Sequence, residues 1–402
     1  MIKKALILAA GKGTRMWPLT DYQPKPLLPV VGKPIIVGQI EQLKKLGVNE
    51  VNILIGYRMK KISDAIGNES KYGLKINYIV QKEQKGTGHA VLQAEGKINE
   101  DFYCINGDTP INYENLQVMQ KNKLAMMVTK VDDGANFGSV NYKNGKLISI
   151  IEKGVVGRTT INAGIYVFNP KIFEAMRGVG KSPRGEYEIT DAIQALANQM
   201  NVHTCEGFWK DIGNPWDLLS SNEFQMKKID EEVEGKIEEN VAINGILHLG
   251  NNSIIKSGTY IEGNVWIGEN CIIGPNAYLR EGTTLCGDNK IGAASEVKNS
   301  IIMKGAKAPH HNYVGDSIIG RGCNLGSGTK IANLRLDKKE IIVTHQGKKI
   351  NTRRKKLGVI MGDFVNTGIN ASIDTGTIIG SHVKIGPGSI VSGTFESDST
   401  VY

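Results

Sequence analysis

Two short segments near the N-terminus carry positive charge beside glycine or proline. The first reads Gly11-x-Gly13-x-Arg15, and Pro24-Lys25-Pro26 follows it. Glycine lets backbone N–H groups approach a phosphate closely, and Arg15 and Lys25 can neutralise a polyphosphate from either side. The segment lacks the Gly-Lys-Ser/Thr of a Walker loop, and Met16 stands where the dinucleotide fingerprint has its third glycine. The pattern therefore predicts a nucleotide-binding loop of another class.

A carboxylate follows an apolar run in Asn106-Gly107-Asp108. Asp108 thus stands where a predicted buried strand ends, at the edge of the sheet where ligands bind. Asn-Gly-Asp is also ordinary turn chemistry, so Asp108 taken alone has a purely structural reading. Its combination with the glycine loop favours the functional interpretation.

Two adjacent histidines, His310 and His311, stand three and two residues before Tyr313. Neighbours in an extended chain point in opposite directions, and no third ligand is spaced to join them, so a metal site is disfavoured. The alternatives are a catalytic histidine and a structural histidine under a loop.

Alternation of apolar runs with helical patterns organises the first half. We expect strands at 4–9, 51–55, 76–80 and 102–105, and helices at 35–46, 60–66 and 89–94. Strand and helix in series predict an α/β, mostly parallel sheet covered on both faces. Ligands bind such sheets at the carboxyl ends of the strands. A polar, charged segment from Leu218 to Glu234 predicts a helix that links the two halves.

The second half repeats every six residues. Apolar residues fall at this spacing without a gap at Ile243, Leu249, Ile255, Ile261, Ile267, Ile273, Leu279, Leu285, Ile291, Val297 and Met303. The register is lost around 304–318, resumes at Ile319, is lost again in a basic segment and returns at Ile373. A short strand plus a tight glycine corner explains this period, which is typical of a parallel β-helix.

Length and composition limit the class of protein. With 402 residues and 40% hydrophobic content, we expect two or three folded domains. The five cysteines are odd in number and lack Cys-x-x-Cys spacing, which disfavours a disulfide framework or a zinc site. No apolar run approaches the roughly 20 residues of a membrane span, and the N-terminus does not resemble a signal peptide, so we expect a cytoplasmic protein without membrane partners.

Positive charge is concentrated in one segment. The net charge is +9, and the stretch from Arg335 to Lys356 holds nine Lys or Arg against Asp337 and Glu340. Such a patch attracts phosphates. No aromatic residue interleaves with these charges, so nucleic acid is not expected as a partner. A solvated charged loop is the alternative reading.

On these motifs the chain resembles the sugar-1-phosphate nucleotidylyltransferases. More closely, it is similar over both halves to an archaeal-like variant of the bifunctional uridylyltransferase/acetyltransferases that make UDP-N-acetylglucosamine. The resemblance implies a Rossmann-like nucleotidyltransferase domain (1–225), a linker (226–240) and a left-handed parallel β-helix acetyltransferase domain (241–402). It also implies Mg²⁺, UTP or dTTP, sugar 1-phosphates and acetyl-CoA as ligands, and a homotrimer or a dimer of trimers.

Specific residues match the family's first site. Arg15 and Lys25 are its catalytic cations, and Asp108 and Asp211 its metal ligands. The expected nucleotide and sugar contacts are Leu8, Ala10, Gly11, Gly13, Gln81, Gly86, Thr87, Asp108, Gly138, Glu152 and Asn162. Asp211 resembles the thymidylyltransferases, whereas uridylyltransferases usually have Asn there, which leaves the base open. Lys153 is equally consistent with a phosphate contact and with a surface charge.

The resemblance also assigns a second site. It implies that His310 acts as a general base toward the amine of an amino sugar 1-phosphate. The substrate-binding residues expected from the family are Arg280, Lys298, Tyr313, Asn324, Ser327, Asn333 and Lys339. Arg353 to Lys356 are expected to meet the phosphates of acetyl-CoA.

Two alternatives remain at this point. One is a single-site nucleotidylyltransferase whose β-helix only assembles or regulates the oligomer, as in ADP-glucose or GDP-mannose pyrophosphorylases. The other is a non-catalytic interaction protein. His310 with Tyr313 argues against the first, and the intact loop from Gly11 to Lys25 with Asp108 argues against the second.

Overall fold

A computed structural model describes residues 1–67 and 69–402. The chain divides into two compact units. The N-terminal unit comprises Met1–Lys12, Pro24–Leu27 and Pro34–Asp211, and the C-terminal unit comprises Gly13–Gln23, Leu28–Lys33 and Ile212–Tyr402. The chain therefore leaves the N-terminal unit twice within its first 35 residues. We refer to Gly13–Gln23 as the signature segment, because it carries Arg15.

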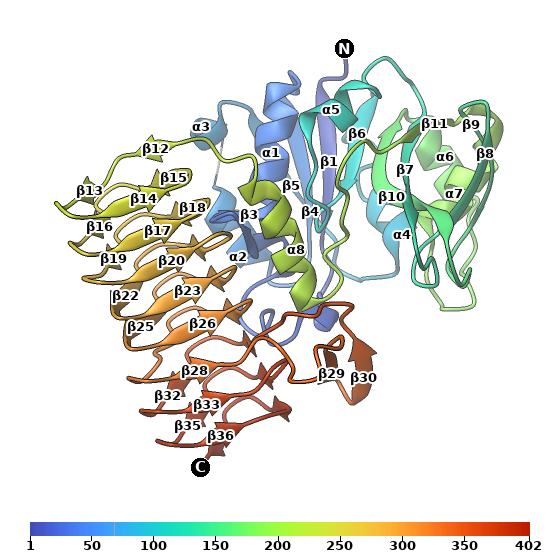
Figure 1. The fold of residues 1–402 in the computed structure, drawn as a ribbon. Helices are drawn as coiled ribbons and strands as arrows, with labels where there is room; N and C mark the ends of the chain where they lie inside the picture. The colour runs from blue at the N-terminus through green and yellow to red at the C-terminus, as the bar shows by residue number, and fades with distance from the viewer. Residues whose placement is uncertain (68) are drawn as a thin grey trace. The chain divides into compact units, whose positions relative to one another are not determined.

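A nine-stranded mixed sheet is the centre of the N-terminal unit, in the order β5-β4-β1-β6-β10-β7-β11-β9-β8 (Figure 1). Its strands are β1 (Lys4–Ala9), β4 (Glu50–Ile55), β5 (Lys75–Val80), β6 (Phe102–Asn106), β7 (Ala125–Val131), β8 (Ser139–Lys143), β9 (Lys146–Ile151), β10 (Thr159–Phe168) and β11 (Asn201–Thr204). The four expected strands β1, β4, β5 and β6 pair in parallel, as predicted. The sheet becomes mixed because β10 runs antiparallel to both β6 and β7.

Helices follow the strands, as the alternation predicted. They are α1 (Ile35–Lys45), α2 (Met59–Ile66), α3 (Glu69–Tyr72), α4 (Thr87–Leu92), α5 (Tyr113–Gln117), α6 (Lys171–Arg177) and α7 (Ile189–Ala195), with 3₁₀ turns η1 (Thr14–Met16), η2 (Lys25–Leu27) and η3 (Ala197–Gln199). Helix α4 begins two residues before the expected start. Gly86 precedes it at φ +104, and a Cβ there would lie 2.5 Å from the carbonyl oxygen of Tyr187, so only glycine fits the close approach that starts the helix.

Three stacks of short parallel strands form the C-terminal unit, a left-handed parallel β-helix (Figure 1). The first face holds β12 (Glu232–Val233), β15 (Leu247–Leu249), β18 (Val265–Ile267), β21 (Thr284–Leu285), β24 (Ile301–Ile302), β27 (Ile318–Ile319), β31 (Ile360–Met361), β34 (Ile378–Ile379) and β37 (Thr394–Phe395). The second holds β13 (Lys236–Ile237), β16 (Ile254–Ile255), β19 (Ile272–Ile273), β22 (Lys290–Ala293) and β25 (Lys307–His310), and then β32 (Asn366–Thr367), β35 (Lys384–Ile385) and β38 (Thr400–Val401). The third holds β14 (Ala242–Asn244), β17 (Tyr260–Glu262), β20 (Tyr278–Arg280), β23 (Glu296–Lys298), β26 (Tyr313–Gly315), β28 (Lys330–Ile331), β33 (Ser372–Ile373) and β36 (Ile390–Val391).

Inward-facing aliphatic residues form columns in which partners from successive coils pair directly, as Ile261 does with Leu279. Contacts between early coils join residues 18 apart, which is three hexapeptides, whereas a later backbone contact spans 17. This coil is therefore one residue shorter than the earlier ones, and the shortening changes which residue points inward. Ile302, not Met303, pairs with Leu285 and enters the core. The prediction at 303 was wrong because constant six-residue counting cannot detect a shortened corner.

The apparent loss of register near 304–318 does not interrupt the coil. Ala308 and Val314 occupy the inward positions and belong to the same core. The second loss is a true insertion, since the backbone N–H of Arg321 reaches Asp363, 42 residues on. The extra chain includes an antiparallel hairpin of β29 (Ile342–His345) and β30 (Lys348–Asn351).

The expected linking helix is shorter than predicted. Helix α8 spans Pro215–Met226 and starts with a capping box between Asn214 and Asp217. It ends before Glu234 because β12 already belongs to the β-helix. A two-stranded sheet of β2 (Pro29–Val30) and β3 (Lys33–Pro34) completes the elements. None of the helices in the described chain combines the length and apolar character that a bilayer crossing requires.

Candidate active sites

The carboxyl ends of β1 and β6 place Asp108 beside the opening loop. Leu8 of β1 pairs with Asn106 of β6, and the N–H of Gly107 donates to the carbonyl oxygen of Leu8 at 3.0 Å. A Cβ on Gly107 would lie 2.8 Å from that oxygen, so the turn requires glycine. Asp108 therefore emerges at the edge of the sheet where parallel strands present ligands.

Lys25 and Asp108 meet directly. Lys25 lies on η2 with 7% of its surface exposed, and its Nζ is 2.5 Å from Oδ2 of Asp108. A buried ammonium needs such a partner, and a phosphate can replace or share it. The sequence predicted both residues but not Gln39 of α1, whose Nε2 donates at 2.8 Å to the carbonyl oxygens of Asn106 and Thr109 on either side of Asp108.

The glycine loop is also tied to the motif that runs from Gln81 to Ala90. Gln84 donates through Nε2 to the carbonyl oxygen of Ala10 at 2.6 Å, and Gln81 is buried with its Nε2 3.0 Å from Nδ1 of His89. The same motif contacts a third segment, Gly185-Glu186-Tyr187-Glu188-Ile189-Thr190-Asp191, which leads into α7. The hydroxyl of Thr87 accepts the N–H of Ile189 at 3.1 Å. Three motifs separated in sequence thus lie together in one unit.

Gly138, Glu152 and Asn162 converge, as expected for residues that contact one sugar. A Cβ built on Gly138 would lie 3.4 Å from Oε2 of Glu152 and 3.7 Å from Cβ of Asn162. The N–H of Asn162 donates to the carbonyl oxygen of Gly138 at 2.8 Å. Thr190 holds Glu152, donating from its hydroxyl to Oε2 at 2.9 Å. Glycine at 138 keeps space open above two polar side chains.

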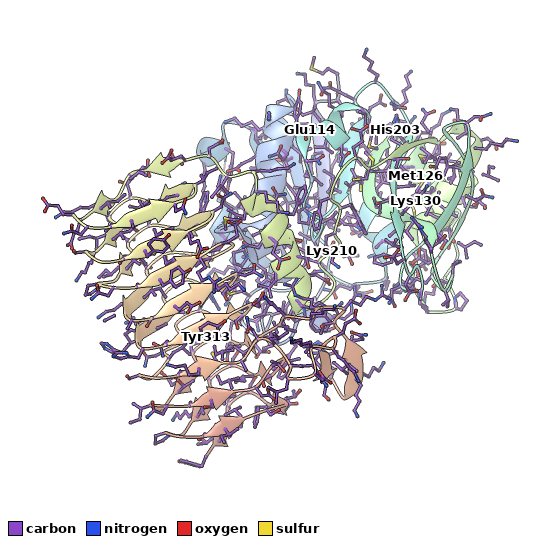
Figure 2. The ribbon with its side chains drawn as sticks, viewed as in Figure 1. Glu114, Met126, Lys130, His203, Lys210 and Tyr313 are labelled. Atoms are coloured by element: carbon purple, nitrogen blue, oxygen red, sulfur yellow. The ribbon has the colours of Figure 1, made fainter. Side chains whose placement is uncertain are left out.

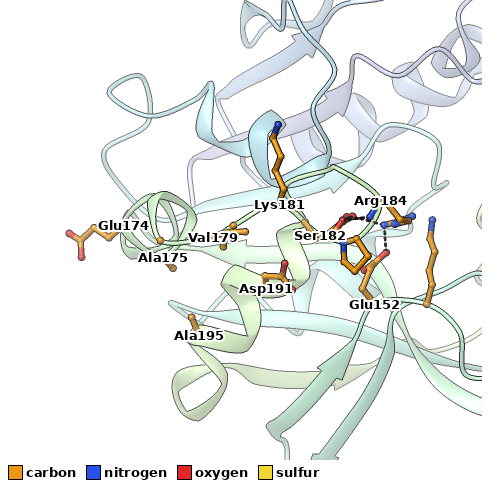
Figure 3. Close-up of a pocket in the computed structure, with 14 residues that line it drawn as sticks. Glu152, Glu174, Ala175, Val179, Lys181, Ser182, Arg184, Asp191 and Ala195 are labelled. Carbon is orange, nitrogen blue, oxygen red and sulfur yellow. Dashed lines mark hydrogen bonds and ion pairs between the residues drawn. The ribbon is translucent and has the colours of Figure 1, made fainter.

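Arg184 fixes the other oxygen of Glu152, a role that sequence reasoning did not assign. Its Nη2 lies 3.1 Å from Oε1 of Glu152 and 2.6 Å from Oε1 of the buried Glu188 (Figure 3). These residues line a cavity of about 830 Å³. Its other lining residues include Lys153, Glu174, Gly178, Lys181, Ser182, Pro183 and Asp191. Burial and then Glu188 raise the pKa of Asp191.

Asp211 ends the N-terminal unit. The indole N–H of Trp209 donates to the carbonyl oxygen of Ala163, next to Asn162, at 3.0 Å. This bond anchors the segment that carries Asp211 to β10.

The carboxylate of Asp108, 28% exposed beside Lys25, has the hard oxygen donors that Mg²⁺ prefers together with phosphate oxygens. Within residues 1–67 and 69–402, no group of three or more His, Cys, Asp and Glu side chains is arranged as a metal site.

Arg15 belongs to the C-terminal unit with the rest of the signature segment. Gly13 has φ +65 and initiates the 3₁₀ turn that holds Arg15. The carbonyl oxygen of Arg15 accepts a hydrogen bond from Nε2 of His345 at 2.9 Å, while the Arg15 side chain is exposed.

In the β-helix, His310 ends β25 at a corner of the coil. Its backbone N–H donates to Oδ1 of Asn312 at 3.1 Å, and its carbonyl oxygen accepts the N–H of Gly328 from the next coil. The ring is exposed. Ser327 therefore adjoins Gly328, the residue that bonds the backbone of His310. Asn324 lies on the same face, bridging Lys307 and Asn366.

Arg280, Lys298, Tyr313 and Asn333 come together on the third face around two carboxylates. Arg280 donates to Oε1 of Glu296 at 2.9 Å, and Asn333 donates to Oδ2 of Asp316 at 2.5 Å. Figure 2 labels Tyr313 on this stack of strands. Burial, then Glu296 and Asp316, raise the pKa of Tyr313, so its phenol is a hydrogen-bond donor at neutral pH.

Lys356, which was expected to meet the phosphates of acetyl-CoA, lies beside this group. Burial lowers the pKa of Lys298, Asp316 opposes this change, and the adjacent Lys356 and Arg280 lower it further. Two ammonium groups facing each other favour an anion between them. Lys356 returns here from the insertion through a bridge to Leu334. Lys339 instead lies on exposed chain, and its backbone N–H bonds Asp337.

Within the basic insertion, Arg354 already has protein partners. Its guanidinium lies 2.5 Å from Oε1 of Glu223 and 3.0 Å from Oγ of Ser220, both on α8. Arg354 is thus a structural cation in this unit. The four residues from Arg353 to Lys356 therefore do not all serve one ligand.

Comparison with known proteins agrees with both halves. A family model described as nucleotidyl transferase matches residues 4–228, and a model described as the GMPPB C-terminal domain matches residues 261–395. Among solved structures, a UDP-glucose pyrophosphorylase complexed with UDP-glucose is 26% identical (TM-score 0.50) and covers 57% of this chain and 100% of its own. A putative glucose-1-phosphate thymidylyltransferase from Bacillus anthracis is 28% identical (TM-score 0.52) and covers 58% and 98%.

Relatives of similar length cover the whole chain. The bifunctional protein GlmU of Methanococcus maripaludis is 42% identical over 405 residues, covering 99% of this chain and 97% of the relative. That of Methanocaldococcus jannaschii is 42% identical with the same coverage. A bifunctional sugar-1-phosphate nucleotidylyltransferase/acetyltransferase of Sulfurisphaera tokodaii is 41% identical over 96% of this chain and 97% of its own.

Proposed function

Because the chain belongs to the nucleotidyl transferase family and, over its full length, to the bifunctional GlmU proteins, we propose that it catalyses two successive transfers. The β-helix acetylates glucosamine 1-phosphate with acetyl-CoA, and the N-terminal half transfers the uridylyl group of UTP to the product. The second step releases pyrophosphate and yields UDP-N-acetylglucosamine. The observation that carries two activities is the group of Arg280, Lys298, Tyr313 and Asn333 on one face of the β-helix, in which Glu296 holds Arg280 and Asp316 holds Asn333, because a β-helix that only assembles subunits does not need such an array of phosphate-binding side chains.

In uridylyl transfer, an oxygen of the sugar 1-phosphate attacks the α-phosphorus of UTP in line, and the bond to the β-phosphate oxygen breaks. The chain supplies positioning and positive charge and needs no covalent nucleophile. Lys25 neutralises phosphate charge from its buried position beside Asp108, and Arg15 acts on the triphosphate from the signature segment. Glu152 and Asn162 bind the sugar above Gly138. Mg²⁺ held by Asp108 and Asp211 would add charge neutralisation and orientation of the phosphates.

In acetyl transfer, the neutral ring of His310 takes a proton from the ammonium form of the amino sugar and so frees the amine. The amine nitrogen then bonds to the thioester carbonyl carbon, the carbon–sulfur bond breaks, and CoA leaves as a thiolate that takes up a proton. A backbone N–H near Ser327 stabilises the oxyanion. Arg280, Lys298 and Lys356 bind the sugar phosphate, and Tyr313 donates to it. Lys356 takes the role that the resemblance had given to Lys339.

Further assignments complete the proposal. UTP is the nucleotide, with dTTP as the alternative that Asp211 leaves open. Exposed cations of the insertion, Arg353 and Lys355, meet the phosphates of acetyl-CoA, and the working oligomer is a trimer in the cytoplasm. The match of residues 261–395 to the GMPPB C-terminal domain favours one second candidate, a single-site nucleotidylyltransferase with a non-catalytic β-helix.

One assay separates the two candidates. The protein is incubated with glucosamine 1-phosphate, acetyl-CoA, UTP and Mg²⁺, and free thiol, pyrophosphate and sugar nucleotide are measured separately. We expect all three products. His310→Ala should abolish thiol release and leave pyrophosphate release intact when N-acetylglucosamine 1-phosphate is supplied. Absence of thiol release from the wild type favours the single-site candidate, whereas thiol release that survives His310→Ala excludes His310 as the general base.

A further inference from the structure

The signature segment is held by the hairpin inserted in the β-helix. The turn of β29–β30 presents His345 and Gln346 to two successive carbonyl oxygens. Nε2 of His345 lies 2.9 Å from the carbonyl oxygen of Arg15, and Nε2 of Gln346 lies 2.6 Å from that of Thr14. All of these residues belong to the C-terminal unit.

His345 is placed to act only as a donor to Arg15. A carbonyl oxygen only accepts, so the proton of the neutral ring lies on Nε2. The side chain is 3% exposed, and Nδ1 is buried without a hydrogen-bond partner among the described residues. The ring packs between Trp17 and Trp216, at centroid distances of 6.1 and 6.3 Å. A buried ring with one unmet nitrogen costs stability, which the packing and the single bond must offset.

The base of the hairpin is anchored in the β-helix. Ile341 and Val343 are each 2% exposed, and a Cβ on Gly376 would lie 2.6 Å from Cγ2 of Ile341. The N–H of Ile341 donates to the carbonyl oxygen of Arg354, which α8 holds through Glu223. The hairpin turn is thus fixed to the coils, and it transmits that position to the backbone of Arg15.

A second contact fixes the far end of the segment. Both Ser381 and Ser397 donate to Oδ2 of Asp21, at 2.8 and 2.9 Å. The segment is therefore held at Thr14–Arg15 by the hairpin and at Asp21 by the coils. The arginine side chain between these anchors stays exposed and available.

We propose that His345 and Gln346 are positioning residues for nucleotidyl transfer: they fix the backbone from which Arg15 reaches the triphosphate. This inference rests on the proposed role of Arg15 and extends it to residues of the other half of the sequence. It makes the hairpin of the acetyltransferase domain a structural part of the first reaction.

The test uses the full-length protein and four variants. His345→Leu removes the donor while keeping an apolar side chain of similar size, and His345→Gln restores an Nε2 donor. Gln346→Met removes the second donor at an exposed position, where folding is least at risk. Thr344→Val is the matched control, because Thr344 adjoins His345 on the same strand but points to solvent.

We expect His345→Leu to lower kcat/KM of pyrophosphate release at least tenfold, mainly through the KM for UTP, and Gln346→Met to lower it about threefold. His345→Gln should recover activity to within about threefold of the wild type. Acetyl transfer by every variant, and both activities of Thr344→Val, should stay within twofold. Wild-type UTP kinetics in His345→Leu overturn the proposal, as does a parallel loss of acetyl transfer or a failure of His345→Gln to rescue.

Amide hydrogen exchange gives a readout independent of turnover. We expect faster exchange over Gly13–Gln23 in His345→Leu than in the wild type or in Thr344→Val. An unchanged exchange rate over Gly13–Gln23 contradicts the proposal that the hairpin holds this segment. Absence of nucleotidyl transfer in the wild type would contradict the proposed function. The exchange experiment would still decide whether the hairpin holds the signature segment.

Discussion

Nζ of Lys25 lies 2.5 Å from Oδ2 of Asp108, although 83 residues separate them in sequence. The pair joins a 3₁₀ turn to the end of β6, and both residues were predicted to be site residues from separate motifs. Lys25 is the more buried partner. Arriving phosphate can therefore draw the ammonium from Asp108 only over a short distance, which keeps the charge in place before substrate binds.

Lys25→Met should remove that charge and keep the volume of the side chain. We expect pyrophosphate release to fall at least about 100-fold, the scale seen when one donor to a developing anion is lost. Acetyl transfer should stay within twofold, because the residues proposed for it lie in the other unit. Lys44→Met, on the exposed side of α1, is the charge-matched control. Undiminished pyrophosphate release would exclude Lys25 from the reaction.

Lys356→Ala should weaken binding of the sugar phosphate to the β-helix. Since a charge-assisted hydrogen bond contributes about 1.5–3 kcal/mol, we expect the KM for glucosamine 1-phosphate in acetyl transfer to rise at least about tenfold. Lys339→Ala should raise it much less, because Lys356 acts on Lys298 directly, whereas Lys339 lies beside Asp337 in the insertion. Steady-state kinetics of the two variants decide between them, and a larger effect at Lys339 would contradict the assignment.

Gly292→Ala should force two coils apart next to His310, the proposed general base. A Cβ there would lie 1.9 Å from the carbonyl oxygen of Pro309, and the following residue, Ala293, pairs with His310. We expect destabilisation of about 3 kcal/mol in thermal unfolding and at least tenfold slower acetyl transfer. Gly38→Ala is the matched control. It meets no atom within 4 Å and lies in α1, so it should stabilise the protein by about 0.5–1 kcal/mol.

His203 should contribute to the pH dependence of stability. Burial lowers its pKa in the folded state, so the neutral ring is favoured there. The unfolded chain binds the proton more readily, and the contribution of His203 is therefore present above about pH 6.5 and is lost as pH falls below it. His203→Gln keeps a donor to Asn122 without a titrating ring. The loss of melting temperature between pH 7.5 and 5.5 should be smaller in the variant by about 1–2 °C, because the ring is only half-buried. Equal losses in both proteins would refute this.

The sequence was sufficient for the architecture where one physical pattern repeated. Parallel strands β1, β4, β5 and β6 followed from buried runs between helical patterns, and the β-helix followed from inward residues such as Ile261 and Leu279. Convergence of Gly138, Glu152 and Asn162 was expected only through the resemblance, because no periodicity relates them.

Three features could not be predicted from the sequence, each for a physical reason. A corner shortened by one residue moves the inward position from Met303 to Ile302 without changing composition. Lys356 reaches Lys298 only because the insertion leaves the β-helix and re-enters it at the same coil. The charge pattern of the sequence does not indicate where the chain re-enters. The hydrogen bond from His345 to Arg15 joins residues 330 positions apart, and nothing local in either segment indicates it.

The insertion before Lys356 leaves the aliphatic columns unbroken. Ile319 pairs with Met361 and Ile331 with Ile373 as if no chain lay between them. Each coil requires only that the chain re-enter the β-helix at the axial position where it left. The length of an insertion is therefore not constrained by the core. An insertion at a corner can therefore add structure without altering the column, and this one carries both Lys356 and the hairpin that holds Arg15.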